Sequence, residues 1–351
     1  SATGSSWMLP ILQLEGPADD ATYFMPLALA WEDTEEERVT RLTPAALAKI
    51  RQQANVGVMA DAFYDEPFCR ALVQAIEVGK ELVTVGGKMK FSATAAFKAA
   101  NIDVRDMPVS RPSAMSSNTV VTLDDTLFLK GYRRLREGVN PELEMGRFLT
   151  DVVHYPNCVP VLGALEYFST DGRVMTLALV QSHVQNQGDG WDYTLGYLER
   201  YLEELRTAGA ATGKAMSTVK AHGGFLALAA MLGKRTAELH LGFTPSRGDA
   251  AFDPEPLAAA DVTGYRERAV AESNSTLALL RERIGQLPAS VQVYAQAFLS
   301  RSATLQTQLA AAQGVAQLGA IKTRYHGDYH LGQVLVTGND FVLIDFEGEP
   351  A

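Results

Sequence analysis

The spacing of hydrophobic positions changes along the chain from short strand-like runs to long helical repeats. Two apolar stretches, at residues 7–14 and 23–31, precede a polar run of helical character at 43–54. Short apolar runs bounded by turn residues favour strands, so we expect a small sheet with helices in this region. A further apolar run at residues 175–180 predicts a strand that ends at Gln181.

In the second half of the chain, large apolar residues recur every three or four positions, the spacing of one helix face. These residues are Leu195, Leu198, Leu202 and Leu205, followed by Phe225, Leu228, Leu232 and Leu239. Gly242 is expected to end the second of these helices, and further helices are expected at about 265–287 and 289–317. The second half is therefore predicted to be mainly helical.

Composition agrees with a globular enzyme. The chain has 351 residues, 47% hydrophobic and 21% charged, which is enough to bury a large core in two or three parts. A net charge of -10 argues against nucleic acid as a partner, because phosphate backbones attract basic surfaces. Cys69 and Cys158 suggest neither a disulfide framework nor a metal motif, so we expect buried thiols. No membrane-length apolar run and no signal-peptide pattern is present, so we expect no membrane partner and a cytoplasmic protein.

Near the C-terminus the sequence reads His326-Gly-Asp-Tyr-His-Leu-Gly-Gln333, continues through two short apolar runs, and reaches Asp345. The runs at 334–336 and 341–344 read as strands, and the intervening Thr-Gly-Asn-Asp carries turn chemistry. A hairpin here brings Gln333 and Asp345 to the same end. Phosphoryl transfer needs an acid to orient the attacking hydroxyl and oxygen ligands for magnesium, and Asp328, Gln333 and Asp345 supply these groups.

This segment resembles the aminoglycoside-phosphotransferase-like branch of the protein-kinase superfold, and within it the bacterial maltokinases, especially the form fused behind trehalose synthase. The resemblance rests on residues 324–335 and on the text Ile-Asp-Phe-Glu-Gly-Glu-Pro at 344–350. It implies an α+β, bilobal, protein-kinase-like fold. The expected parts are an N-terminal cap at 1–87, a mixed small lobe at 88–181, and a mainly helical large lobe at 182–351. Because that fold normally continues with helices after Ala351, we expect a fragment.

The resemblance also implies a nucleotide site. Its expected phosphate-contacting residues are Ser116, Ser117, Asn118 and Thr119. They precede a strand, a turn at Asp124-Asp125 and a second strand ending in Lys130, and we expect this hairpin to cover the phosphates. The hairpin has no glycine, so hydroxyl, amide and backbone groups must make the contacts. Backbone groups of about Gln181 to His183 are expected to meet the adenine.

Lys130 is expected to neutralise the phosphates while a helix glutamate fixes its ammonium group. Asn140-Pro141 looks like a helix N-cap followed by the first helical residue. Glu142 and Glu144 then fall in the first turn. The maltokinase text points to Glu144 as the partner of Lys130, with Glu142 as the alternative.

The resulting hypothesis is an ATP- and Mg²⁺-dependent enzyme that phosphorylates maltose at its anomeric hydroxyl to give maltose 1-phosphate. Asp328 would align that hydroxyl, Gln333 and Asp345 would hold Mg²⁺, and His330 would brace the loop beside the substrate. Two alternatives stay open. The chain is another small-molecule kinase, for glucosamine or an aminoglycoside, or it is a non-catalytic module of a fused or associated trehalose synthase.

Overall fold

The computed structural model describes residues 6–16, 20–112, 118–209, 218–311 and 319–346. Contacts divide the chain into a larger unit, Ser1–Gly242 with His326–Ala351, and a smaller unit, Phe243–Tyr325. All the residues predicted to act in catalysis or nucleotide binding belong to the larger unit. The expected boundaries at 87 and 181 remain predictions.

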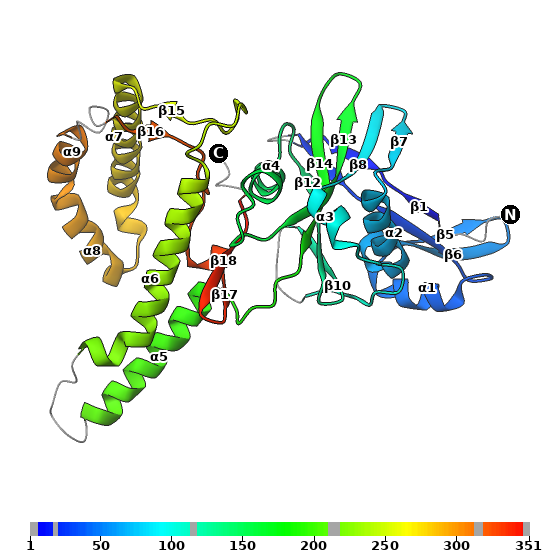
Figure 1. The fold of residues 1–351 in the computed structure, drawn as a ribbon, viewed down its shortest axis with the longest axis horizontal. Coiled ribbons are helices and arrows are strands. Elements are labelled where there is room, and N and C mark those ends of the chain that lie inside the picture. Colours follow the sequence, from blue (N-terminus) through cyan, green and yellow to red (C-terminus); the bar gives the residue numbers. More distant parts are fainter. Residues whose placement is uncertain (1–5, 17–19, 113–117, 210–217, 312–318, 347–351) are drawn as a thin grey trace. The chain divides into compact units, whose positions relative to one another are not determined.

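An antiparallel sheet of seven strands is the largest sheet of the larger unit (Figure 1). Its strands, in spatial order, are β7 (Glu81–Thr84), β8 (Gly87–Ala93), β13 (Val161–Ser169), β14 (Val174–Ser182), β11 (Leu127–Gly131), β10 (Thr119–Leu123) and β9 (Val109–Ser110). The strand predicted to end at Gln181 is β14. On β11, Lys130 pairs with Val120 of β10 and Leu179 of β14. Neighbouring strands on both sides therefore fix the backbone at Lys130.

The N-terminal part forms two smaller sheets, where the apolar runs predicted one. One has the order β1 (Ser6–Met8), β4 (Leu27–Trp31), β6 (Asn55–Asp61) and β5 (Ala46–Gln52), with α1 (Glu36–Leu42) packed on β4 and β6. The other has the order β12 (Arg134–Leu135), β3 (Ala21–Phe24) and β2 (Ile11–Leu14). Because β12 follows β11 directly, the second sheet joins the N-terminal part to the strand that carries Lys130.

The prediction of a helix at 43–54 was wrong. After the short helical turn η1 (Thr43–Ala45), the chain forms strand β5, which pairs with β6 through a tight turn at Gln53, where φ is 56°. Alanine, lysine, arginine and glutamine favour helices when isolated, but pairing with a neighbouring strand overrides that weak preference. The strand lies at the edge of its sheet and is mostly exposed.

One hydrophobic core runs through the N-terminal sheets, α2 (Glu66–Glu77) and the seven-stranded sheet. Phe63, in the helical turn η2 (Ala62–Tyr64), is fully buried against Gly131 of β11. A Cβ atom at Gly131 would lie 2.2 Å from the Phe63 ring, so only glycine allows this contact. Helix α3 (Ala95–Ala100) also packs on β8 and β13. Cys69 and Cys158 are buried, as expected.

Helix α4 (Pro141–Arg147) begins where the sequence predicted. Asn140 is its N-cap, and the Asn140 side chain accepts a hydrogen bond of 3.0 Å from the backbone N–H of Leu143. Proline in the first turn is compatible with the helix because the N–H groups there have no intrahelical partner. A wider π-helical turn, η3 (Phe148–Val153), continues the helix.

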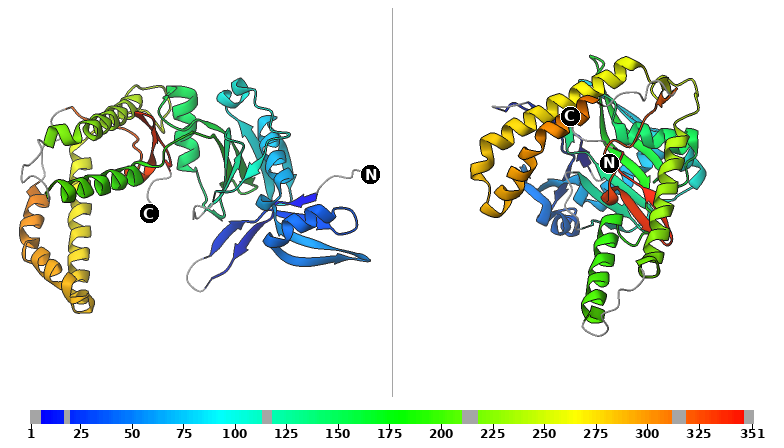
Figure 2. Two further views of the ribbon diagram at one scale, coloured as in Figure 1. Left: turned by 90° about the horizontal axis from the view of Figure 1, so that it is seen from below. Right: turned by 90° about the vertical axis from the view of Figure 1, so that its left-hand side faces the viewer.

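Helices α5 (Gly190–Gly209) and α6 (Thr218–Gly242) pack against the two strands of the hairpin β17 (Val334–Thr337) and β18 (Asp340–Leu343) (Figure 2). Helix α6 ends at Gly242, as predicted. The four predicted face leucines of α5 remain 43–53% exposed; they are Leu195, Leu198, Leu202 and Leu205. The helical spacing was right, but this face is not part of the core of the described chain.

The smaller unit is mainly helical. It contains α7 (Ala259–Arg283), the short turn η4 (Ile284–Gln286), α8 (Ala289–Ser300), α9 (Ser302–Ala311) and the strand pair β15 (Glu255–Pro256) and β16 (Ile321–Lys322). The single helix predicted at 289–317 is thus divided, within its described part, into α8 and α9. Among the described residues, no helix combines the length and apolar character needed to cross a bilayer.

Candidate active site

The hairpin β17–β18 is held between two extended segments of the larger unit. On one side, Leu343 donates to the carbonyl of Asn157 at 2.8 Å, and Val159 donates to the carbonyl of Leu343 at 3.2 Å. On the other side, Gln187 donates to Val336 at 2.8 Å, and Val336 donates to Gly188 at 3.0 Å. Both hairpin strands therefore have a backbone partner on their outer edge, which fixes the residues at their ends.

Gln333 and Asp345 meet at one end of this hairpin, as predicted. The N–H of Ile344 donates to the carbonyl of Gln333 at 3.0 Å, and Gln333 Nε2 donates to Asp345 Oδ2 at 3.1 Å. Asp345 has a left-handed backbone with φ at 62°, which turns the chain sharply after β18. Its other carboxylate oxygen, Oδ1, lies 3.4 Å from the ammonium of Lys130.

Lys130 forms its shorter ion pair with Glu142, at 2.8 Å. Both side chains are buried, with 11% and 4% of their surface exposed. The resemblance to maltokinases favoured Glu144 over Glu142 as the partner of Lys130. The observed ion pair supports Glu142, the alternative, instead. Residues two positions apart on a helix point roughly 200° apart, so Glu142 and Glu144 face different directions.

Two further side chains hold the Glu142 carboxylate. Tyr132 donates its hydroxyl to Oε2 at 2.5 Å, and Gln181 donates its amide to Oε1 at 3.3 Å. A buried charge needs several donors of this kind to offset the water that it loses. No pattern in the sequence predicted the Tyr132 contact, because it depends on the tertiary contact between α4 and the end of β11.

A pocket of about 330 Å³ lies beside this cluster. It is lined by Val120, Phe128, Lys130, Glu142, Val159, Gln181, Ser182, His183, Val184, Asn186, Leu335, Ile344 and Asp345. Its volume and its apolar walls with a few charged groups are typical of a small-molecule site. The same pocket is therefore lined by the segment predicted to meet adenine, by Lys130 and by Asp345.

That backbone groups of about Gln181 to His183 meet adenine stays a prediction, and two of the N–H groups in this segment have partners within the protein. The N–H of Ser182 donates to Pro160 at 3.0 Å, and the N–H of His183 donates to Thr126 at 2.8 Å. Gln181 lies within the sheet pairing, and its side chain contacts Glu142. These two N–H groups are therefore occupied, and Val184 and Asn186 are the next residues lining the pocket.

That the β10–β11 hairpin covers the phosphates stays a prediction. The turn at Asp124-Asp125 joins the ends of β10 and β11 that lie next to Thr126 and His183, whereas Lys130 pairs with Val120 at the opposite end. Of the predicted phosphate contacts, Asn118 and Thr119 lie at the Lys130 end, where β10 begins. Ser116 and Ser117 lie outside the described residues.

The loop that carries Asp328 is fixed to the end of β18. His326 is 3% exposed, and its Nε2 donates to the carbonyl of Ile344 at 2.8 Å. Its ring contacts Phe346 and Tyr329, with centroid distances of 4.6 and 5.2 Å. Tyr329 in turn shares a hydrogen bond of 2.7 Å with Thr236 of α6. The Asp328 loop and the Asp345 turn are therefore packed on the same buried histidine.

Asp328 remains accessible, with 37% of its side chain exposed, and His330 Nε2 lies 3.6 Å from its Oδ2. His330 Nδ1 accepts the N–H of Gly332 at 3.0 Å, so Nδ1 carries no proton and Nε2 is the protonated nitrogen. A distance of 3.6 Å is too long for a hydrogen bond. His330 thus lies beside Asp328 and leaves its carboxylate open to a substrate.

The residues at the hairpin end fit a magnesium site that is completed by phosphates. Mg²⁺ usually takes one or two protein carboxylates together with waters and substrate phosphates. Asp345 offers a partly exposed carboxylate, and Gln333 offers its amide oxygen after a half-turn of the amide group. In the described part of the chain, no group of three or more His, Cys, Asp or Glu residues forms a metal site. The donor set therefore fits Mg²⁺ bound with a nucleotide.

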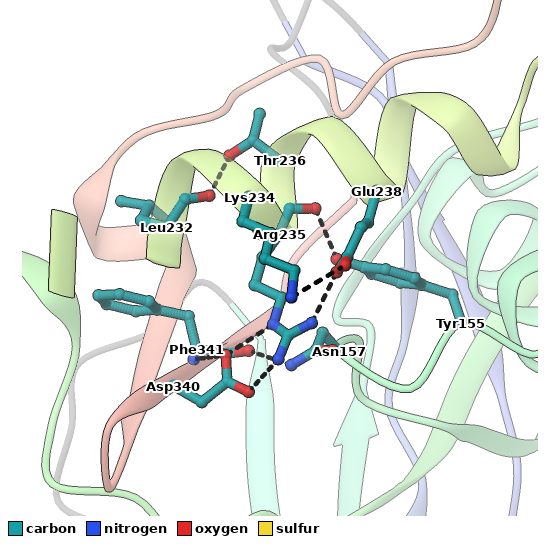
Figure 3. A network of polar contacts seen from close by, with 9 residues as sticks. All are labelled: Tyr155, Asn157, Leu232, Lys234, Arg235, Thr236, Glu238, Asp340 and Phe341. Carbon is teal, nitrogen blue, oxygen red and sulfur yellow. Dashed lines mark hydrogen bonds and ion pairs between the residues drawn. The ribbon is translucent and has the colours of Figure 1, made fainter. Parts of the chain in front are cut away.

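A second polar network holds the far end of the hairpin (Figure 3). Arg235 of α6 makes a two-point contact with Asp340, with Nε to Oδ1 at 2.8 Å and Nη2 to Oδ2 at 2.6 Å. Its Nη1 donates to Glu238 at 2.7 Å. Asn157 donates to the carbonyl of Phe341 at 2.9 Å. Asp340 lies 105 residues from Arg235 along the chain, so the sequence alone does not predict this contact.

Comparison with known proteins also finds similarity to kinases. No protein-family model matches the chain. Glucosamine kinase of Streptacidiphilus jiangxiensis is 27% identical over 174 residues, which cover 50% of this chain and 32% of that protein. Glucosamine kinase solved in complex with glucosamine, ADP and inorganic phosphate has a TM-score of 0.57 and 20% identity, and the match covers 100% of this chain and 69% of that one. Crystal form B of glucosamine kinase has a TM-score of 0.56 and 20% identity, and covers 98% and 67%.

The chain shares the fold of these kinases. The matched part spans about a third of the curated relative and about two thirds of the solved chains.

Proposed function

We propose that this protein is an ATP-dependent sugar kinase. The observation that carries the proposal is the line of contacts from Glu142 through Lys130 to Asp345, three residues that line one pocket. Asp345 in turn contacts Gln333. An ammonium group placed between a buried glutamate and an exposed aspartate is what a nucleotide-phosphate site requires. The fold shared with glucosamine kinases is consistent with this function.

In this proposal the pocket binds ATP, with the base between the apolar walls of Val120, Phe128 and Leu335. Lys130 neutralises the α and β phosphates, while Glu142 limits the motion of its ammonium group. Asp345 and Gln333 would hold Mg²⁺, which neutralises charge on the β and γ phosphates when bound. Asn118 and Thr119 lie at the Lys130 end of β10, where they can contribute phosphate contacts.

Asp328 orients the acceptor hydroxyl toward the γ-phosphoryl group. The transition state of phosphoryl transfer is loose, so alignment of the hydroxyl matters more than a strongly basic carboxylate. His326 keeps the Asp328 loop against the end of β18 through Ile344, and His330 flanks the carboxylate. The acceptor proton is then received by the Asp328 carboxylate as the new P–O bond forms.

For the acceptor, we propose maltose, phosphorylated at its anomeric hydroxyl to give maltose 1-phosphate and ADP. The support is the resemblance of residues 324–335 and 344–350 to maltokinases. That resemblance also motivates a trehalose synthase as fused or associated partner. Glucosamine is the second candidate, favoured by the relative and the solved structures.

A substrate panel tests these alternatives. The protein is incubated with ATP and Mg²⁺ and with maltose, glucosamine, glucose or kanamycin, and ADP release and the phosphorylated product are measured. Turnover with maltose alone supports the first candidate, and turnover with glucosamine supports the second. If ATP binds but no acceptor is phosphorylated, and adding trehalose synthase does not change this result, the kinase proposal is wrong.

A further inference from the structure

A second pocket, of about 440 Å³, lies where the N-terminal sheets meet the end of β10. We call it the outer pocket, and it is lined by Tyr23, Phe24, Met25, Asp61, Tyr64, Arg111, Asn118, Thr119, Val120 and Arg133. Its volume lies within the usual range for small-molecule sites. Half of its lining residues carry hydroxyl, amide or aromatic groups, a composition suited to a hydroxylated ligand.

The two arginines of the outer pocket differ in their partners. Arg133 forms an ion pair with Asp61 and donates from Nε to the hydroxyl of Thr119 at 2.6 Å. Its charge is therefore compensated by a carboxylate of the same wall. Arg111 lies over the ring of Tyr64 at 4.8 Å and donates from Nε to the carbonyl of Phe63 at 3.0 Å. Arg111 forms no ion pair in the described part of the chain.

Arg111 also has an unsatisfied donor. Its Nη2 is shielded from solvent and has no hydrogen-bond acceptor among the residues that the structure describes. Leaving a buried donor without an acceptor costs about 1–3 kcal/mol, and more when the group is charged. With one uncompensated arginine and one compensated pair, the outer pocket carries a net positive charge. An oxyanion bound beside Arg111 would compensate this charge and would accept a hydrogen bond from the unsatisfied donor.

We propose that the outer pocket binds a small phosphate-bearing metabolite of the sugar phosphate class. A guanidinium fork matches the geometry of phosphate oxygens better than a lysine ammonium does. Because Nη2 is shielded, binding requires a small turn of the Arg111 guanidinium on the Tyr64 ring. The phosphate would meet Arg111, and the sugar hydroxyls would meet the tyrosine, threonine and asparagine groups around it.

The outer pocket shares a wall with the proposed nucleotide pocket. Val120 lines both, and in the sheet Val120 pairs with Lys130. Thr119, which receives the Arg133 hydrogen bond, is the first residue of the same strand. A ligand on Arg111 therefore acts on the strand beside Lys130, and we infer that it changes nucleotide affinity. This second step, unlike the binding itself, rests on the proposed function.

Calorimetric titration of the nucleotide-free chain tests the binding. The probes are inorganic phosphate and glucose 1-phosphate, with glucose as the uncharged control. We expect saturable binding of both anions, tighter for glucose 1-phosphate, and none for glucose. Arg111→Gln should weaken anion binding by about tenfold or more, the factor for a lost charged hydrogen bond. If the wild-type chain shows no saturable binding, or Arg111→Gln binds equally well, the proposal is overturned.

Three variants serve as controls for this interpretation. Met25→Glu keeps Arg111 but supplies a carboxylate in the same pocket, so it should also abolish anion binding while circular dichroism shows an intact fold. Arg105→Gln removes an exposed arginine that is paired with Asp103 outside the pocket, and it should bind normally. Lys130→Met should retain anion binding; a loss there would move the anion to the nucleotide pocket and overturn the site. Unchanged ATP affinity at saturating glucose 1-phosphate would overturn the coupling alone.

Discussion

Lys130 lies 2.8 Å from the carboxylate of Glu142 and 3.4 Å from that of Asp345, so one ammonium group joins α4 to the end of the β17–β18 hairpin. The two carboxylates differ in exposure, at 4% for Glu142 and 36% for Asp345. The buried one is suited to holding the lysine in place. In the proposed function, the more exposed one would exchange the lysine for a metal ion when nucleotide phosphates bind.

The first prediction concerns this pair. Lys130→Met should lower turnover by about 10²–10³-fold, the range for losing one preorganised electrostatic contact. Glu142→Gln should act through the same ammonium group, so the double variant should lose little more than Lys130→Met alone. The measurement is a double-mutant cycle on turnover at saturating ATP.

Glu144→Gln is the matched control for that cycle. It removes a carboxylate from the same helix turn, but one that points roughly 200° away from Glu142. Its effect should be small and should add to that of Lys130→Met. If Lys130 were strongly coupled to Glu144 and independent of Glu142, Glu144 would be the partner of Lys130 in the active state.

The second prediction concerns the acceptor. Asp328→Asn keeps the size of the side chain but removes its charge, so turnover should fall by about 10²–10⁴-fold, as for other positioned proton acceptors. ATP affinity, measured by calorimetry, should barely change, because Asp328 is not in the wall of the nucleotide pocket. A variant that lost ATP binding and kept its turnover would exclude this role.

The third prediction concerns the metal. Asp345→Asn should remove nearly all turnover, since a neutral amide is a much weaker ligand for a hard cation than a carboxylate. Gln333→Leu should weaken activity less, because it removes one neutral ligand. Binding of Mn²⁺–ATP, followed by electron paramagnetic resonance, separates metal loss from misfolding. Normal Mn²⁺–ATP affinity in Asp345→Asn would contradict the assignment.

Local chemistry predicted the β17–β18 hairpin and the start of α4 correctly. The Thr-Gly-Asn-Asp turn, the two short apolar runs and the Asn140-Pro141 cap each act within a few residues, so the sequence alone contains the information. The approach of Gln333 to Asp345 follows from the hairpin register. That part of the candidate site needed no knowledge of the tertiary structure.

The errors occurred where a distant partner decides the outcome. The 46–52 segment has helical residues and becomes a strand because β6 pairs with it. Glu142 rather than Glu144 meets Lys130, a tertiary contact between α4 and β11 that the spacing of the two glutamates does not determine. The spacing of residues along the chain does not predict these contacts.

A fourth prediction follows from the burial of His326. Burial lowers the pKa of this histidine below its usual 6.5, although the Ile344 carbonyl and the charges of Asp345 and Asp328 oppose the shift. The unfolded chain therefore binds the proton more readily than the folded one. The contribution of His326 to stability should be complete above pH 6.5 and should be lost as the pH falls through the lower folded pKa.

Chemical denaturation as a function of pH measures this effect. His326→Gln keeps a donor for the Ile344 carbonyl but has no group that titrates in this range. The decrease in the free energy of unfolding below pH 6.5 should be smaller in His326→Gln than in the wild-type chain. An identical pH dependence in both proteins would assign the acid sensitivity to other groups.

The last prediction concerns Arg235, which holds the hairpin at the end away from the site. Its two-point contact with Asp340 ties the turn of the hairpin to α6, and Gln333 and Asp345 are at the other end of the same two strands. Arg235→Lys keeps the charge but cannot reproduce the two parallel hydrogen bonds. A displacement of about 1 Å at a reacting group lowers rates by as much as about 100-fold, so turnover should fall in Arg235→Lys although the residue is remote from the phosphates. Amide hydrogen exchange in β17 and β18 should rise together with that loss. Lys234→Gln, on the neighbouring and more exposed position of α6, is the control and should change neither quantity. Faster exchange with normal turnover in Arg235→Lys would show that the contact stabilises the hairpin without positioning the site.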